Sequence, residues 1–149
     1  DVIRFALVSV SAFAALAGMM MLSDARAQTG PPAIAGDWTG KYICTQGITA
    51  LRLNIAQGAG HTITATFNFG PLPENPEVPR GAYRMSGTYD PASRHMKLSG
   101  VKWIDAPFGY AMVGLDGRMT ASGDTISGYV PDLLGCTDFE VRRPVELIG

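Results

Sequence analysis

Few residues in this chain have the types and spacing that acid–base or nucleophilic chemistry needs. The two histidines, His61 and His95, fall beside predicted tight turns, and Asp90 precedes His95 by five residues across one of them. We interpret this pair as solvated turn charges rather than as a catalytic acid and base. The sequence contains no G-x-S-x-G, H-E-x-x-H, P-loop or G-x-G-x-x-G motif. We therefore predict that the protein is not an enzyme.

Metal and cofactor sites are not indicated either. A metal site needs clustered His, Cys or carboxylate ligands with convergent geometry. The carboxylates Asp116, Asp124, Asp132 and Asp138 occur singly near predicted turns, where they are typical turn formers. We expect neither a metal ion nor a cofactor.

The N-terminal segment has the pattern of a secretory signal. An apolar run without charge extends from Phe5 to Leu22 after Arg4, and Ala25 and Ala27 fit the small-residue rule for cleavage. We predict a signal helix over 1–27 that is cleaved before Gln28, and we expect its true start to lie upstream. The alternative is an uncleaved membrane anchor, which is the one membrane contact that we consider.

If the protein is exported, its two cysteines are expected to form a disulfide. An even number of cysteines in an oxidising compartment indicates a disulfide, and here one pairing is possible, Cys44 with Cys136. This bond closes a loop of about 90 residues, for which chain entropy predicts a stabilisation of roughly 4 to 5 kcal/mol. We predict a periplasmic or secreted protein.

The charge balance excludes a function that depends on a strong basic field. Twelve Lys and Arg against thirteen Asp and Glu give a formal charge of -1. Nonspecific nucleic-acid binding needs a clear excess of basic residues. We therefore expect no nucleic-acid partner.

The elements that position these residues are predicted to be β-strands. Apolar and polar residues alternate with period two in eight segments, separated by clusters rich in Gly, Pro, Asp and Asn. These segments cover 38–44, 51–55, 62–69, 83–89, 94–101, 110–120, 125–130 and 137–143. We predict an all-β domain over 36–143, preceded by a flexible leader over 28–35 and followed by a tail over 144–149.

Eight sequential antiparallel strands can close as an up-and-down barrel or split into a two-sheet β-sandwich. The cysteines favour the barrel, because Cys44 ends the first strand and Cys136 opens the last, so that a bond between them would clamp the seam. The long connections are the odd-numbered ones, 44–47, 70–81, 102–109 and 131–135. In a barrel these connections all lie at one end, where we expect the binding site.

Two of these connections have an unusual composition. Segment 70–81, the proline-rich arch, carries four prolines together with Glu74, Glu77 and Arg80. The other brings together Trp103, Asp105, Phe108 and Tyr110. We predict that these seven residues form a binding surface, flanked by Gln46 and Asp132 from the first and last connections. Alternatively, the aromatic rings fold inward and plug the barrel.

Several motifs in the chain resemble an uncharacterised family of exported bacterial β domains. The resemblance rests on Tyr42-Ile43-Cys44-Thr45-Gln46-Gly47-Ile48-Thr49, Glu74-Asn75-Pro76, Val78-Pro79, Gly81-Ala82-Tyr83, Trp103-Ile104, Pro107, Gly109-Tyr110, Met112-Val113-Gly114-Leu115 and Gly135-Cys136-Thr137. Domains of this family also occur as tails on caspase-like peptidases, which implies an accessory or recognition module. The chain has no peptidase region, so the resemblance implies no catalytic residue.

Together these observations predict an exported, non-enzymatic binding or accessory module. Its loops at one barrel end would recognise a protein, a glycan or a small apolar ligand. One alternative is a small enzyme that uses Glu74, Glu77 and Asp105, which would require two carboxyl groups to converge in a pocket. The other is a purely structural surface or assembly subunit.

Overall fold

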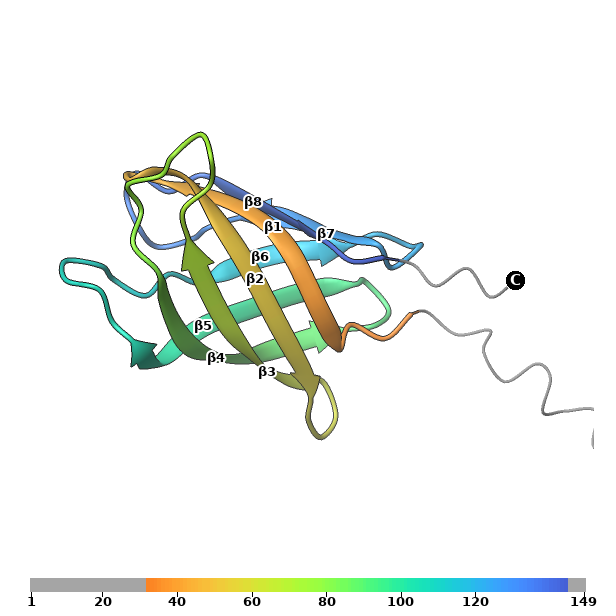
Figure 1. The fold of residues 1–149 in the computed structure, drawn as a ribbon. Helices are drawn as coiled ribbons and strands as arrows, with labels where there is room; N and C mark the ends of the chain where they lie inside the picture. The colour runs from red at the N-terminus through yellow and green to blue at the C-terminus, as the bar shows by residue number, and fades with distance from the viewer. Residues whose placement is uncertain (1–31, 145–149) are drawn as a thin grey trace, which may run out of the picture. The chain divides into compact units, whose positions relative to one another are not determined.

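The computed structural model describes residues 32–144, which form a closed barrel of eight antiparallel strands in sequential order (Figure 1). The strands are β1 (Gly36–Cys44), β2 (Gly47–Gln57), β3 (Thr62–Gly70), β4 (Gly81–Asp90), β5 (His95–Asp105), β6 (Leu115–Met119), β7 (Thr125–Tyr129) and β8 (Asp138–Arg142). The up-and-down barrel predicted from the sequence is confirmed, and the sandwich is excluded. The predicted signal helix over 1–27 lies outside the described residues, as does the tail beyond residue 144.

Period-two alternation explains why these segments are strands with one buried face. In β2, Leu51, Leu53 and Ile55 are buried, whereas Arg52 and Asn54 are exposed. Inward-facing residues of all eight strands form a single core. Over residues 32–144 the structure contains no helix with the length and apolar character that a membrane crossing requires.

The seam of the barrel lies between β1 and β8. Cys44 and Cys136 form a disulfide across it, with their Cα atoms 3.8 Å apart. The amide of Thr137 also donates to the carbonyl of Ile43 over 2.9 Å, which continues the β1–β8 ladder toward this disulfide. The predicted clamp at the seam is therefore confirmed.

The strand predicted over 110–120 is too long at its start, because β6 begins at Leu115. Residues 110–114 instead run across the barrel mouth, where the hydroxyl of Tyr83 donates to the carbonyl of Val113 and accepts from its amide, both over 2.9 Å. A buried phenol thus replaces the strand partner that this segment lacks. Conversely, β5 extends beyond its predicted end at residue 101, because Trp103 pairs with Tyr83 across the sheet.

The end of the barrel away from the Cys44–Cys136 disulfide is closed by residues that we expected to be a flexible leader. Ile34 is fully buried, and its carbonyl accepts a hydrogen bond from the indole of Trp38 over 3.0 Å. The guanidinium of Arg143 lies 4.1 Å from the centre of the Trp38 ring and donates to the carbonyls of Ala33 and Ala35. The predicted leader is therefore too long: residues 32–35 belong to the barrel, and 28–31 lie outside the described residues.

Candidate functional site

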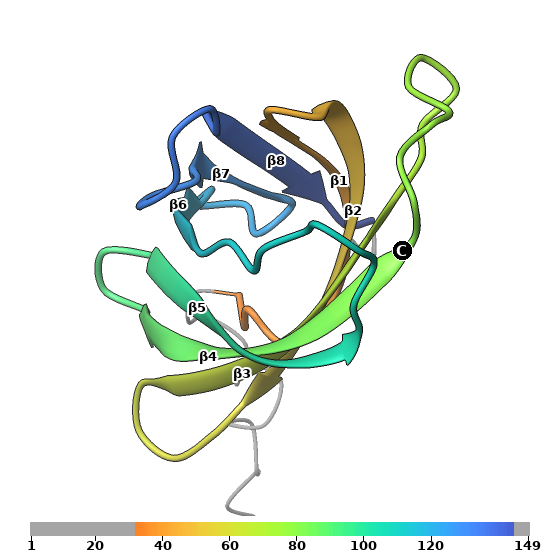
Figure 2. The same cartoon turned by 90° about the vertical axis from the view of Figure 1, so that its left-hand side faces the viewer.

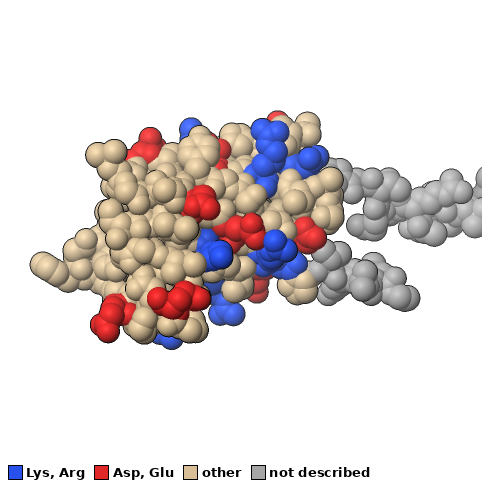
Figure 3. All heavy atoms as spheres, turned by 90° about the horizontal axis from the view of Figure 1, so that it is seen from above, with Lys and Arg blue, Asp and Glu red and all other residues tan. Residues whose placement is uncertain are grey.

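Three of the four connections predicted to be long are long and lie at one end of the barrel; the fourth, between β1 and β2, lies at the same end but is a turn of two residues, Thr45 and Gln46. This end, the mouth, carries the β1–β2 turn, the proline-rich arch, the β5–β6 loop over 106–114 and the β7–β8 loop over 130–137 (Figure 2). The opposite end carries the short connections 58–61, 91–94 and 120–124. Basic and acidic side chains are interspersed on the barrel face drawn in Figure 3, which agrees with the near-neutral charge.

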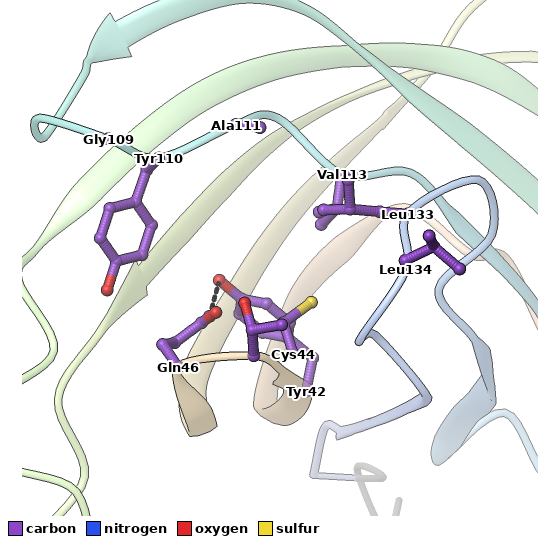
Figure 4. A pocket seen from close by; sticks show the side chains of 10 residues that line it. Tyr42, Cys44, Gln46, Gly109, Tyr110, Ala111, Val113, Leu133 and Leu134 are labelled. Carbon is purple, nitrogen blue, oxygen red and sulfur yellow. Dashed lines mark hydrogen bonds between the residues drawn. The ribbon is translucent and has the colours of Figure 1, made fainter.

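A cavity of about 480 Å³, the mouth cavity, opens between three of these connections (Figure 4). It is lined by Tyr42, Cys44, Thr45, Gln46, Gly109, Tyr110, Ala111, Val113, Leu133 and Leu134. All of these residues are uncharged. The volume falls within the usual range for small-molecule sites, roughly 300 to 1,000 Å³.

A short hydrogen-bond chain fixes the polar side of this cavity. The hydroxyl of Thr49 donates to the carbonyl of Gly47 over 3.1 Å, so its oxygen accepts from Nε2 of Gln46 over 3.0 Å. The same amide nitrogen donates to the phenol oxygen of Tyr42 over 3.3 Å. Burial raises the pKa of Tyr42 above its usual value, and the nearby Tyr110 adds to this shift. Tyr42 therefore presents a protonated hydroxyl.

Below the cavity, the mouth half of the barrel is filled with aromatic rings. The rings of Phe67 and Tyr83 stack with centroids 4.6 Å apart, and Phe69 stacks on Tyr110 at 5.4 Å. Trp103 meets Tyr83 edge-on at 5.1 Å. The lumen is thus a packed core, and the cavity lies above it at the mouth.

The aromatic residues of the connection predicted over 102–109 were expected either to form a surface site or to plug the barrel. Each interpretation holds for some of these residues. Trp103 and Tyr110 are half-buried and pack on the core, as the plug interpretation predicts. Phe108 is fully exposed, with a relative accessibility of 103%, as a surface site requires. Trp103 and Asp105 belong to β5 rather than to a loop, and neither lines the mouth cavity.

The arch does not join the aromatic residues as predicted. At its tip, Nδ2 of Asn75 donates to the carbonyls of Gln46 and Ile48, so the arch leans over the β1–β2 turn. It meets the β5–β6 loop at its base, where a Cβ on Gly81 would lie 2.8 Å from the Pro107 ring. Figure 2 shows the arch projecting away from that loop.

The other predicted site residues are therefore dispersed. Glu74 lines a cleft of about 290 Å³ on the outer barrel surface, together with Lys41 and Arg142. Arg80 lines a second outer cleft of about 560 Å³. Glu77 is exposed on the arch, and Asp132 lines a separate cleft beside Met112. Of the nine predicted binding residues, Gln46 and Tyr110 line the mouth cavity.

The larger outer cleft is less suited to a specific small ligand than the mouth cavity. Its floor carries Asp37, Asn54 and Asn68, which hydrogen-bond to one another across three strands. Their polar groups are already partnered, and they stand on the solvent-facing side of the sheet. The mouth cavity combines apolar walls with a few polar groups, among them the Tyr110 hydroxyl, which makes no hydrogen bond to the described part of the chain; this is the usual composition of a ligand site.

A polar cluster on the outer surface was not predicted. Nε2 of His95 lies 2.6 Å from one carboxylate oxygen of Asp116, and the hydroxyl of Tyr129 donates to the other oxygen over 3.1 Å. This hydrogen bond raises the pKa of Tyr129. Asp90 instead accepts hydrogen bonds within its own turn, as expected. Residues 32–144 contain no group of three or more His, Cys, Asp and Glu side chains that could hold a metal ion.

Sequence reasoning missed this cluster because it depends on strand register. Asp116 falls within the segment predicted as a strand over 110–120, but the sequence does not show that it lies directly opposite Tyr129 of β7 or that His95 reaches it diagonally from β5. Tyr42 and Val113 of the mouth cavity are missed as site residues for a related reason. Both lie in segments predicted as strands, and period-two alternation does not reveal which inward residues lie at the open end.

Comparisons with known proteins establish the fold alone. No protein-family profile matches the sequence, and neither does any curated protein. Among solved structures, the chain is similar to a de novo designed fluorescence-activating β-barrel, with a TM-score of 0.51 and 12% identity over 74% of this chain and 93% of that one. The described part of the chain is thus an eight-stranded β-barrel of the same general architecture.

Proposed function

We propose that this protein is an exported, non-enzymatic binding module that holds a small, largely apolar ligand in the mouth cavity. The observation that carries the proposal is the cavity itself: about 480 Å³, apolar on one side, and bordered by a fixed amide and two phenols. Sites of this kind bind ligands by apolar contact and orient them with a few polar groups.

The walls of the cavity are held from three directions, which supports a preorganised site. The disulfide fixes Cys44, the arch residue Asn75 holds the β1–β2 turn, and the Tyr83 hydroxyl holds Val113. Preorganised walls lower the entropy cost of binding, because little has to be ordered when the ligand arrives.

The disulfide is compatible with an oxidising compartment, which supports export. A non-enzymatic role is supported by the composition of the cavity lining, which holds a disulfide sulfur, a primary amide and two phenols but no carboxylate or imidazole. The accessory role implied by the resemblance to exported bacterial β domains remains a prediction.

A cavity-filling substitution tests this proposal. Wild-type protein should enhance the fluorescence of Nile red, a neutral apolar dye, and Ala111→Trp should abolish the enhancement because Ala111 lines the cavity. Ala92→Trp is the matched control, since Ala92 is exposed in the turn between β4 and β5 at the opposite end. Equal dye binding by the two variants, or none by the wild type, would overturn the proposal.

A protein partner is the second candidate, favoured by two apolar side chains at the mouth. Phe108 and Leu134 have relative accessibilities of 103% and 96%. Contiguous exposed apolar patches mark interaction sites, and these two side chains lie on loops at the same end of the barrel. A pull-down from periplasmic extract with wild type and with the double variant Phe108→Ser, Leu134→Ser tests this candidate: a partner that both proteins retain equally would exclude these tips as its docking site.

A further inference from the structure

We propose that the mouth cavity selects uncharged ligands whose apolar body carries an oxygen acceptor, such as the carbonyl of a ketone or ester. This inference rests on the proposed binding function and names the ligand class of the same site. It follows from two features of the lining: the absence of charged side chains, and the presence of hydroxyl groups that can donate hydrogen bonds to a ligand.

The lining excludes charged ligands. None of its ten residues carries a formal charge, and Leu133, Leu134 and Val113 make one side apolar. A carboxylate or ammonium group entering this cavity would lose water without gaining an opposite charge, which is strongly unfavourable. A neutral ligand avoids this cost.

The hydrogen-bond chain leaves the Tyr42 hydroxyl free to donate. Thr49 uses its proton on the carbonyl of Gly47, so its oxygen must accept from the Gln46 amide nitrogen. This fixes the amide orientation, and the second proton of Nε2 goes to the phenol oxygen of Tyr42. Tyr42 therefore accepts from Gln46, and its own proton can go either to the oxygen of Thr49, its second side-chain hydrogen-bond partner, or to a ligand in the cavity.

Tyr110 supplies a second donor from the opposite wall. Its hydroxyl makes no hydrogen bond to the described part of the chain, and its ring is held by stacking on Phe69. In Figure 4 the Tyr110 side chain extends into the cavity toward Gln46, so both phenols border one space. Tyr110 and Tyr42 can therefore both donate a hydrogen bond to a ligand in this cavity, and the Tyr42 oxygen already accepts from Gln46.

A purely apolar ligand would displace water from the Tyr110 hydroxyl and leave it without a hydrogen-bond partner in the described part of the chain. Sites with buried polar groups discriminate strongly against analogues that leave those groups unpaired. A carbonyl oxygen accepts two hydrogen bonds and adds no charge, so it fits both features of the lining.

A matched naphthalene series tests the inference on the full chain. The three probes are 2-acetylnaphthalene, its hydrocarbon isostere 2-isopropenylnaphthalene, and the charged 2-naphthoate. Calorimetric titration should show that the ketone binds at least roughly 10-fold more tightly than either of the others, as one unpaired buried donor implies. Tyr42→Phe and Tyr110→Phe, singly and together, should reduce this preference toward unity, because the ketone loses a donor and the hydrocarbon no longer leaves a hydroxyl unpaired. Tyr129→Phe, on the outer surface, is the control variant.

The outcomes separate the two proposals. If none of the probes binds, the proposed binding function itself fails. If the hydrocarbon binds as tightly as the ketone, or naphthoate binds more tightly, the cavity is a binding site but the ligand class inferred here is wrong. A ketone preference that persists in the Tyr42→Phe, Tyr110→Phe double variant would also overturn the inference. Circular dichroism verifies that each variant is folded.

Discussion

The amide side chain of Asn75 joins the tip of the arch to the turn between β1 and β2. Its Nδ2 donates to the carbonyl of Gln46 over 2.7 Å and to that of Ile48 over 3.0 Å. Gly47 lies between the two, with a φ of +94°, and a Cβ there would lie 2.9 Å from Nδ2. A glycine in the left-handed region is thus needed both for the turn and for the approach of Asn75. This contact sets the position of Gln46 at the mouth cavity.

Asn75→Ala should therefore destabilise the protein and weaken ligand binding at the same time. Two partly buried carbonyls lose their donor, which predicts a loss of about 1 to 2 kcal/mol in the free energy of unfolding. Urea denaturation measures this loss, and dye titration measures binding. Asn68→Ala is the control, because its exposed amide makes long contacts of 3.4 Å. Equal losses in both variants would contradict the special role of Asn75.

Trp103 and Phe108 should respond differently to truncation, although they lie five residues apart. Trp103 packs edge-on against Tyr83 and Phe69, so Trp103→Ala should cost about 2 to 4 kcal/mol of stability. Phe108 is fully exposed, and Phe108→Ala should stay within about 0.5 kcal/mol. Thermal or urea denaturation decides between them. A small loss of stability for Trp103→Ala would indicate that this ring contributes little to the core, as the surface site predicted from the sequence requires.

The strand number, the closure and the disulfide were predictable because they depend on local pattern and on topology. Alternation identifies each strand, Gly, Pro, Asp and Asn mark the turns, and the parity of eight strands places Cys44 and Cys136 at one end of the seam. None of these steps requires knowledge of which residue faces which in the neighbouring strand. The predictions of strand number, closure and disulfide therefore hold even though the predicted ends of β5 and β6 are wrong by several residues.

The details of the site depend on contacts that the sequence does not specify. The lean of the arch follows from one side chain, Asn75, bonding across a separation of 29 residues to Gln46. The pairing of β4 with β5 contains two register shifts, which move Asp105 and its neighbours relative to any regular ladder. Likewise His95 meets Asp116 because β5 and β6 pair over a short stretch near one barrel end. These contacts therefore become visible only in the three-dimensional structure.

Arg143→Ala should release the described N-terminal residues from the barrel end opposite the mouth. The guanidinium donates to the carbonyls of Ala33, Ala35 and Gly123 and stacks on Trp38, so its removal should cost about 2 kcal/mol. Hydrogen exchange at residues 33–38 should accelerate. Arg142→Ala is a matched control, because Arg142 is exposed and forms a solvent-exposed ion pair with Glu140. Unchanged exchange in the Arg143 variant would count against this anchoring role.

The seam disulfide should make a large contribution to stability. Replacing both cysteines, Cys44→Ser with Cys136→Ser, opens a loop with a separation of 92 residues. Chain entropy predicts a loss of roughly 4 to 5 kcal/mol. Urea denaturation of the double variant and of reduced wild type should give the same midpoint, below that of the oxidised protein. A double variant as stable as the oxidised protein would show that the β1–β8 ladder alone holds the seam.

Stability should fall on the alkaline side because two buried tyrosines resist ionisation. Desolvation raises the pKa of Tyr42 and Tyr83 in the folded protein, whereas in the unfolded chain both return to about 10. Below pH 10 neither state loses these protons, so the stabilisation is fully present. Above it the unfolded chain ionises first, and the free energy of unfolding decreases by up to about 1.4 kcal/mol per pH unit for each tyrosine. Urea midpoints measured from pH 8 to 11 should show this decline, and Tyr42→Phe should make it shallower. A pH-independent midpoint would mean that these two hydroxyls are open to solvent and that Tyr42 at the mouth cavity is not the protected phenol described here.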